Sequence, residues 1–332
     1  MQFAANFWHG AKLGLRWAFG AAGLACLAVT GAAAQQAPRH ITIVVPFAAG
    51  GGSDVIARTI AEPLQQRLGQ TVIIDNKPGA SGNLGTQAVA RAAADGHTLL
   101  FTADPTFTAN ISLMKNAPYH PISDFAPIIE ATAGTMVLVV HNSMPVTSTQ
   151  EFLAYAKARP GEINYGSAGV GTPHHLTMEF LKLTAQVKLT HIPFRDTAGA
   201  NTNLIGGHVT AMFLPLNVAL PLPQDKVRLL AVTSRERTAA APTLPTFVEQ
   251  GFSEFESTLS FGFLAPAGTP RDVVVRYNAA FNEILRSPQV AAKLTTLGLM
   301  PTGGTPERYG ESIAKDFVKW QKVIKEGAIS IE

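Results

Sequence analysis

The length, composition and charge of the chain exclude several classes of protein. The chain has 332 residues, of which 46% are hydrophobic and 15% charged, and its formal net charge is +3. Charges this balanced give no sign of a nucleic acid or an acidic membrane surface as partner. A single cysteine excludes a small fold held together by several disulfides. The length suits one large domain or two of about 150 residues.

The first 34 residues are interpreted as a secretory signal peptide. Lys12 and Arg16 precede an apolar run from 17 to 29, and the small residues Gly31 to Ala34 follow. This order matches the basic, apolar and cleavage regions of a signal. A membrane anchor is the alternative, although the run is shorter than the roughly 20 residues that a span needs.

The cysteine usage of the chain indicates a compartment. Cys26 lies inside the predicted signal, and Gly23 stands where a lipobox would normally carry Leu, so we do not expect lipidation. The mature chain would have no thiol, and 24 basic residues against 23 acidic ones, because Lys12 and Arg16 are two of the 26. A long exported chain without cysteine fits a bacterial periplasm.

Strands and helices alternate regularly from residue 41. Runs of consecutive apolar residues predict strands, at 41–45, 72–75 and 98–102. Apolar residues recur every four positions from Ile56 to Leu68, which predicts a helix that Pro63 should kink or deprive of one hydrogen bond. A helix from about 84 to 94 and a turn at 103–106 follow. Three successive strand–helix units predict a right-handed, parallel, doubly wound sheet.

The second half of the chain repeats this pattern. Further strands are predicted, at 136–140, 187–192, 208–213, 227–232 and 258–265. Ser148 with Glu151 three residues later is a capping box, and Thr172 followed by Pro173 begins another helix. The chain is expected to be helical after residue 270. The last helix should bury one apolar face, made by Ile313, Phe317, Trp320 and Ile324.

Three glycine-rich turns follow predicted strands. They lie at 46–54, 76–83 and 164–171. In an open parallel sheet such turns meet at the carboxyl ends of the strands, where backbone N–H groups and helix N-termini can bind an anion. We therefore predict that these turns hold a carboxylate. Glycines needed only for tight turns are the alternative.

Backbone donors alone could supply micromolar affinity. Each hydrogen bond to a charged ligand group contributes roughly 1.5–3 kcal/mol, and micromolar binding needs about 8 kcal/mol. A few such bonds at each end of a small dicarboxylate would suffice after ordering costs. No arginine clamp is required, and the turns contain no arginine.

Motifs for catalysis and metal binding are weak. Ser167 does not sit in a Gly-x-Ser-x-Gly elbow, and no Walker or His-Glu-x-x-His sequence is present. His174 and His175 are adjacent at a helix start, so they cannot face the same way, and they should cap that helix or contact solvent. His191 and His208 are expected to be framework residues. We predict no cofactor, no metal and no enzyme activity; a hydrolase using Ser167 and His175 is the alternative.

Several motifs of the chain resemble those of a receptor family. They are Val45–Gly51 with Asp54, Asn76–Asn83, Asp95–Leu100, Asn164–Ser167, Leu230–Ser234 and Ala265–Pro270. In order and spacing the chain resembles the Bug-type periplasmic solute-binding proteins of tripartite tricarboxylate transporters, from about Ile41 to Lys325. The resemblance implies an α/β fold of the periplasmic-binding-protein type II kind, in which two doubly wound αβ lobes are joined by two crossing strands.

The resemblance also implies the domain organisation. Residues 38–138 together with 261–332 would form the first lobe, and residues 139–260 the second. The strands that cross between the lobes would lie near 136–140 and 258–264, with the ligand between the lobes.

A set of ligand-binding residues is implied in the same way. In the family, the first two glycine turns grip one carboxylate through backbone donors and ordered water. The matching positions of this chain are Phe47, Ala49, Gly50, Gly51, Ser53, Asp54, Ala80, Ser81, Gly82 and Asn83. The rest of the rim and the opposite lobe would be supplied by Thr102, Asp104, Ser167, Gly169, Thr172 and Asp196.

Two departures from the family pattern bear on the ligand. Leu214 and Pro215 stand where members often have an acidic residue and an asparagine. Asp196 stands behind Arg195, where members often have glycine. An apolar distal wall would disfavour an amino-bearing ligand and would allow an apolar or aromatic body.

The function implied is that of an extracytoplasmic receptor. The protein would bind a small dicarboxylate, tricarboxylate or aromatic carboxylate between two closing lobes in the periplasm. As a monomer it would deliver this ligand to the membrane components of a tripartite tricarboxylate transporter. A receptor that reports to a sensor kinase is the alternative, and neighbouring genes would separate the two.

Overall fold

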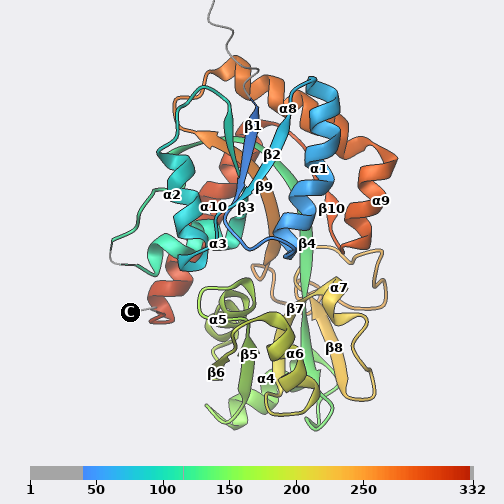
Figure 1. Cartoon of the computed structure of the whole chain (residues 1–332). Coiled ribbons are helices and arrows are strands. Elements are labelled where there is room, and N and C mark those ends of the chain that lie inside the picture. Colours follow the sequence, from blue (N-terminus) through green and yellow to red (C-terminus); the bar gives the residue numbers. More distant parts are fainter. Residues whose placement is uncertain (1–39, 115, 330–332) are drawn as a thin grey trace, which may run out of the picture. The chain divides into compact units, whose positions relative to one another are not determined.

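The computed structural model of the protein describes residues 40–114 and 116–329 (Figure 1). The predicted signal peptide, 1–34, lies outside these ranges. Within them, no helix combines the length and the apolar character that crossing a membrane requires.

The first three strand–helix units form as predicted. The strands are β1 (Ile41–Val45), β2 (Val72–Asn76) and β3 (Thr98–Ala103), and the helices α1 (Gly52–Leu68) and α2 (Asn83–Ala90). Strand β1 pairs in parallel with both β2 and β3. Ile56, Ile60 and Leu64 of α1 are buried, so the predicted helical face is confirmed. Pro63 lies inside α1.

The parallel pairing predicted for the first three strands is confirmed, and the complete sheet is mixed. Strand β9 (Thr258–Pro266) is antiparallel to β3, and β4 (Phe125–His141) is antiparallel to β9. The short β10 (Met300–Pro301) also pairs with β4. Strands buried on both faces carry the same apolar pattern whatever their direction, which is why the sequence did not distinguish them.

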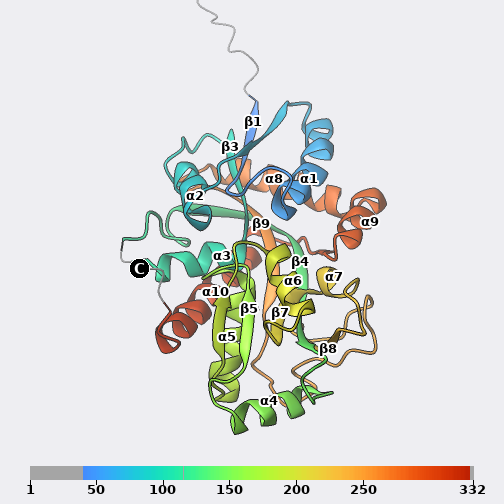
Figure 2. The same cartoon turned by 60° about the horizontal axis from the view of Figure 1, so that its bottom comes forward.

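The two crossing strands are β4 and β9, which run side by side between the two parts of the sheet (Figures 1 and 2). Strand β4 pairs with β9 up to Thr135, and from Met136 it pairs with β7 (Ala211–Pro215) and β8 (Val227–Val232). The predicted strand 136–140 is thus only the second half of β4. We call the part of the sheet before this change, with its helices, the first lobe, and the part after it the second lobe.

The second lobe completes the sheet. Strand β5 (Asn164–Ser167) is parallel to β6 (Thr190–Pro193) and to β7. The strand order through both lobes is β2-β1-β3-β9-β4-β7-β5-β6. The helices of this lobe are α4 (Thr149–Ala158), α5 (Pro173–Ala185), α6 (Thr197–Ile205) and α7 (Leu216–Ala219). Ser148 Oγ accepts a hydrogen bond from Glu151 N at 3.2 Å, which confirms the predicted cap of α4.

Helices cover both faces of the sheet in each lobe. In the first lobe α1, α8 (Arg271–Arg286) and α9 (Pro288–Thr296) share one apolar core, and α2, α3 (Asp104–Ala109) and α10 (Pro306–Glu326) share another. In the second lobe α4 and α5 pack on one face, and α6 and α7 on the other. This double covering confirms the predicted doubly wound lobes.

The first lobe contains one helix that was predicted as a turn and two short helices that were not predicted. The segment predicted as a turn at 103–106 instead begins α3, with Asp104 in its first turn and Pro105 at a first-turn position. Proline suits both a turn and a helix start, so the sequence was ambiguous there. Two short 3-10 helices, η1 (Ala80–Gly82) and η2 (Asn110–Ser112), follow β2 and α3.

Helix α10 joins the two lobes through an apolar cluster. The predicted face of Ile313, Phe317, Trp320 and Ile324 is buried, as expected. Trp320, Val323 and Ile324 pack with Leu176 of α5, and with Ala109 and Leu113 beside η2. The ring of Trp320 meets Phe180 of α5 edge-on, with centroids 6.2 Å apart.

Candidate functional site

The first glycine turn links β1 to α1 and is held by a buried carboxylate. Residues 48–52 are exposed, whereas Asp54 is only 3% exposed. Asp54 Oδ2 accepts a hydrogen bond from Gly50 N at 2.9 Å, which folds the turn back onto the first turn of the helix. The amides of Gly52 and Ser53 are first-turn donors with no intrahelical acceptor, so they are free for an anion.

Asp54 belongs to a network that joins the first turn to the second strand. Arg58 Nε lies 3.0 Å from both carboxylate oxygens, and Asn76 Nδ2 donates to Asp54 Oδ1 at 3.0 Å and to Phe47 O at 3.1 Å. The hydrogen bond from Arg58 lowers the pKa of Asp54 to about 2, so the carboxylate is ionised at neutral pH. Asp54 therefore braces the turn through its own hydrogen bonds.

Arg58 and Asn76 were not among the predicted site residues. The spacing of Asp54 and Arg58 by four residues on a helix was a signal that could have found the first. The contact of Asn76 with Phe47 and Asp54 is tertiary and has no local signal in the sequence.

The second glycine turn has an unusual backbone. The φ angles of Gly79, Ala80, Ser81 and Gly82 are 137°, 48°, 54° and 92°, so four successive residues lie at positive φ. Side chains other than glycine are strained there, by about 1–2 kcal/mol per residue. Gly82 N donates to Gly79 O at 3.0 Å, and Asn110 Nδ2 donates to Ser81 O at 2.6 Å. The side chain of Asn110 thus stabilises the strained turn through a hydrogen bond to its backbone.

The first and second turns lie against each other. Their strands β1 and β2 are adjacent and parallel, and Val45 pairs with Asn76 at the carboxyl ends. A Cβ built on Gly82 would lie 3.4 Å from the ring of Phe47 and 3.5 Å from Pro46 Cβ. The exposed residues Ala49, Gly50 and Gly51 and the exposed residues Ala80 and Ser81 therefore gather at one edge of the sheet.

Three of the predicted first-lobe residues lie in the interior instead. Asn83 and Thr102 are 3% and 2% exposed. Asp104 is 2% exposed, and its Oδ1 accepts a hydrogen bond from Tyr309 Oη at 2.5 Å. Burial raises the pKa of Asp104 well above its usual value. The side chains of these three residues are therefore not part of the exposed edge.

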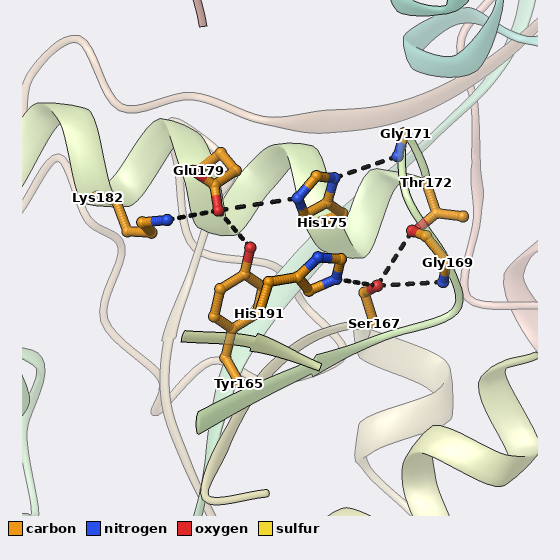
Figure 3. A network of polar contacts seen from close by, with 9 residues as sticks. All are labelled: Tyr165, Ser167, Gly169, Gly171, Thr172, His175, Glu179, Lys182 and His191. Atoms are coloured by element: carbon orange, nitrogen blue, oxygen red, sulfur yellow. Dashed lines mark hydrogen bonds and ion pairs between the residues drawn. The ribbon is translucent and has the colours of Figure 1, made fainter. Parts of the chain in front are cut away.

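The third glycine turn closes on itself in the second lobe (Figure 3). Ser167 Oγ lies 2.6 Å from His191 Nε2 and accepts a hydrogen bond from Gly169 N at 3.1 Å. Thr172 Oγ1 donates to Gly169 O at 2.7 Å. The polar groups of Ser167, Gly169 and Thr172 thus all have partners within the second lobe.

A stack of aromatic rings lies behind this turn (Figure 3). The rings of His175 and His191 are nearly parallel, with centroids 3.9 Å apart. The ring of Tyr165 is nearly parallel to both, and its centroid lies 4.9 Å from that of His191 and 6.3 Å from that of His175. Glu179 Oε1 accepts hydrogen bonds from Tyr165 Oη and, at 2.7 Å, from Lys182 Nζ. Burial lowers the pKa of His175 to about 4 and that of His191 to about 3, so both rings are neutral at pH 7.

The two adjacent histidines do face different ways, as predicted. His175 Nδ1 accepts a hydrogen bond from Gly171 N at 3.1 Å, which is the expected helix-end capping. The expectation of solvent contact is wrong for His174, which is 7% exposed and has no partner for either ring nitrogen. In the described part of the chain, no three His, Cys, Asp or Glu residues are placed to hold a metal ion.

Two expectations about the distal wall need correction. Leu214 is fully buried among Val137, Leu216 and their neighbours, so it does not offer an apolar wall to a ligand. Asp196 is exposed and caps α6, since its Oδ1 accepts a hydrogen bond from Gly199 N at 2.8 Å. Leu214 thus belongs to the apolar core of the second lobe, and Asp196 to the start of α6.

Comparison with known proteins places the chain in a family. Residues 56–329 match the profile of TctC, the tripartite tricarboxylate transporter family receptor. The chain belongs to this receptor family. Protein BugT of Bordetella pertussis is 34% identical over 290 residues, which cover 87% of this chain and 89% of that protein.

Solved structures of similar proteins share the fold of this receptor. A protein of Rhodopseudomonas palustris with adipate superposes with a TM-score of 0.76 at 33% identity, covering 89% of this chain and 99% of that one. MatC of the same organism, with bound malate, gives a TM-score of 0.73 at 32% identity, covering 86% and 99%. The predicted resemblance and the predicted fold class are both confirmed.

The geometry around Ser167 also bears on the hydrolase alternative. Ser167 is fully buried, and its partner is His191 rather than the predicted His175. A serine nucleophile must reach its substrate, and this hydroxyl is enclosed by its own turn. The family is one of binding receptors, with which this enclosed serine agrees.

Proposed function

We propose that the protein is an extracytoplasmic receptor that captures a small carboxylate and delivers it to a tripartite tricarboxylate transporter. The observation that carries the proposal is the contact between the two glycine turns, whose exposed residues meet where Gly82 packs against Phe47. The similar proteins with adipate and malate support a carboxylate as the ligand class.

The paired turns suit the chemistry of a carboxylate. The N-terminus of α1 offers the amides of Gly52 and Ser53, and the positive end of the helix dipole favours an anion there. Each hydrogen bond to a charged group contributes roughly 1.5–3 kcal/mol, so a few of them account for micromolar affinity. Asp54 does not repel the ligand strongly, because its charge is neutralised by Arg58.

The proposed contact residues are at least partly exposed, apart from Gly82, which is buried and is included because it lies at the junction of the two turns. In the first lobe they are Phe47, Ala49, Gly50, Gly51, Ser53, Ala80, Ser81 and Gly82. In this proposal Asp54 holds the first turn in place, and Asn83, Thr102 and Asp104 lie in the interior without touching the ligand. Ser167, Gly169 and Thr172 form the facing turn of the second lobe. Asp196 is left out, because its carboxylate is engaged as a helix cap.

The remaining parts of the function follow from the family and the sequence. The lobes are proposed to span 38–138 with 261–332, and 139–260, and to close on the ligand. The predicted signal peptide would export the chain to the periplasm, where it acts as a monomer without enzyme activity. A membrane partner can distinguish the loaded receptor only if closure changes its shape.

A thermal-shift screen of monocarboxylates, dicarboxylates and tricarboxylates, including aromatic ones, tests the proposal. Ligand at 100 times its Kd stabilises the folded state by about 2.7 kcal/mol, which raises Tm by several degrees. No shift with any carboxylate, confirmed by calorimetric titration, would contradict the proposed function.

The variant Gly82→Leu tests the position of the site. A side chain at this position meets Phe47 and fills the junction of the two turns, so we expect affinity to fall at least a hundredfold for whichever carboxylate binds. Gly161→Leu is the matched control, because Gly161 has a similar φ of 84° but no atom within 4 Å of its built Cβ. If Gly82→Leu and Gly161→Leu bind the ligand with equal affinity, the ligand does not bind at the junction of the two turns.

A further inference from the structure

The motif Leu230–Ser234 is one of those that carry the resemblance to the receptor family, and the proposed carboxylate site does not use it. Most of the motif belongs to β8, which ends at Val232. Thr233 follows directly and is fully buried. The contacts of Thr233 indicate a role for this motif.

Thr233 lies where the two crossing strands separate. Strands β4 and β9 pair directly as far as Thr135 and Thr258, so Met136 and Ser257 would form the next antiparallel pair. Each of them instead forms hydrogen bonds with Thr233. Thr233 is thus inserted between the two chains at the point where β4 changes its partner strands.

Thr233 makes two hydrogen bonds to β4 and two to the residue that precedes β9. Its backbone N–H donates to Met136 O at 2.9 Å, and its Oγ1 accepts from Met136 N at 3.1 Å. On the other side, its Oγ1 donates to Ser257 O at 2.5 Å, and its carbonyl oxygen accepts from Ser257 N at 3.3 Å. Any residue could supply the two backbone bonds, whereas the other two require a hydroxyl that donates and accepts at once.

Further hydroxyl groups surround this bridge. Thr177 Oγ1 of α5, which is also fully buried, lies 2.7 Å from Ser257 Oγ. Thr135 Oγ1 accepts a hydrogen bond from Ser234 N at 3.0 Å. Each of these contacts reaches one side of the separation, whereas Thr233 Oγ1 reaches both.

The bridge restrains how the lobes can move. Rotation of one lobe against the other must change backbone angles near Met136 and Ser257, because these residues join the crossing strands to the second lobe. A buried hydroxyl bonded to both keeps their spacing fixed, since breaking either bond would leave a buried polar group unpaired. The two strands can then bend together but cannot separate further.

We propose that the hydroxyl of Thr233 is the positioning group of the hinge. It couples the two crossing strands, so that the lobes rotate about one axis and do not move independently. Thr233 does not touch the ligand and acts through β4 and β9. The inference rests on the proposed closure of the lobes, and it adds the residue that guides closure and a role for the motif Leu230–Ser234.

The test measures lobe motion without any ligand. The one cysteine of the chain lies in the predicted signal, so Glu62→Cys on α1 and Lys157→Cys on α4, both at exposed positions, place one spin label on each lobe of the mature protein. Pulsed electron paramagnetic resonance then gives the distribution of distances between the labels. Thr233→Val loses two of the four hydrogen bonds; if the four contribute equally, the stiffness halves and the distribution becomes about 1.4 times wider.

Two variants separate this role from the loss of a buried hydroxyl. Thr177→Val removes an equally buried hydroxyl of the same cluster that bonds to Ser257 on one side of the separation, and it should leave the width unchanged. Thr233→Ser keeps the hydroxyl and should restore the width of the wild type. If thermal melts show that Thr233→Val does not fold, Thr233→Ala removes the same hydroxyl without placing a methyl group against the two backbone atoms, and the same widening is expected.

The outcomes separate this inference from the proposed function. Equal widths for the wild type and the variant without the hydroxyl would overturn the role of Thr233. Equal widening in Thr177→Val, or no restoration in Thr233→Ser, would overturn it as well. None of these results depends on a ligand, so failure of the carboxylate screen would overturn the proposed function and leave the measurement of the hinge intact.

Discussion

At the residue scale, the site depends on a carboxylate that is not offered to the ligand. Asp54 is buried, and it fixes Gly50, Arg58 and Asn76 around itself. The resemblance to the receptor family implied a ligand contact for Asp54. In the structure Asp54 instead positions the turn through its hydrogen bonds. A free carboxylate would repel an anionic ligand, but the charge of Asp54 is neutralised by Arg58.

The variant Asp54→Asn tests this role through pH. The pKa of Asp54 in the folded protein, about 2, lies below the usual value near 4, so its stabilising contribution is complete above about pH 5 and is lost as pH falls toward 2. We expect the variant to be less stable by about 2 kcal/mol at pH 7. This difference should shrink at pH 3, as measured by urea denaturation of both proteins.

Asp75→Asn is the control for that experiment. Asp75 lies on β2, next to Asn76, and pairs with the exposed Lys77 at 2.7 Å. The substitution makes the same charge change near the same turn, and we expect little loss of stability because exposed ion pairs contribute little. A pH-independent difference between Asp54→Asn and the wild type would contradict the assigned role of Asp54.

Local signals explain which residues could be predicted from the sequence. The cap of α4 by Ser148 and the N-terminal Pro173 of α5 involve neighbours along the chain, and both were correct. Asn110, which supports Ser81 across 29 positions, depends on a tertiary contact and was missed. His174 was misjudged because its burial depends on how α5 packs at the junction of the lobes.

At the element scale, the third glycine turn lies close to the first lobe. Gly171 has φ of 76°, and a Cβ built on it would lie 2.6 Å from Leu113 Cδ1 and 3.5 Å from Asn110 Oδ1. The absence of a side chain at Gly171 therefore matters twice. It permits the left-handed backbone conformation, and it leaves room for the turn to approach η2. Because Asn110 also holds the second glycine turn, this contact links the turns of the two lobes.

Gly171→Ala should therefore be destabilising for two separable reasons. The left-handed backbone contributes about 1–2 kcal/mol, and the contact with Leu113 adds to this cost. Gly161 has a φ of 84° and no atom within 4 Å of its built Cβ, so Gly161→Ala has only the cost of the left-handed backbone. We expect Gly171→Ala to be less stable than Gly161→Ala in denaturant melts. Adding Leu113→Ala should reduce the difference in stability between Gly171→Ala and Gly161→Ala. If Leu113→Ala leaves this difference unchanged, the contact with the Leu113 side chain does not contribute to it.

The directions of the strands were harder to predict than their positions. Each predicted strand overlaps an observed one, because apolar runs bounded by turns mark buried strands. The antiparallel pairing of β9 with β3 and β4 was not foreseen, since it arises from the return of the chain between lobes. The resemblance to known receptors, rather than the apolar pattern, supplied the crossing strands.

At the scale of the whole molecule, closure of the lobes should be measurable in two ways. Trp320 is the one tryptophan in the described ranges, and it lies in the cluster that joins α10 to α5. We expect a saturating carboxylate ligand to lower the radius of gyration in solution scattering and to change the emission of Trp320. Gly82→Leu should show neither change at the same ligand concentration. Unchanged dimensions at saturation would contradict closure.

The bracing of the two first-lobe turns has a kinetic consequence. Asp54, Arg58 and Asn76 join the two turns through hydrogen bonds that need no ligand. Under the proposed closure, the second lobe would reach the ligand only after it has bound to these turns. The association rate should then depend on the first lobe alone, and the residence time of the ligand on the second. Natural variation in the second lobe could thus lengthen or shorten ligand retention without slowing capture.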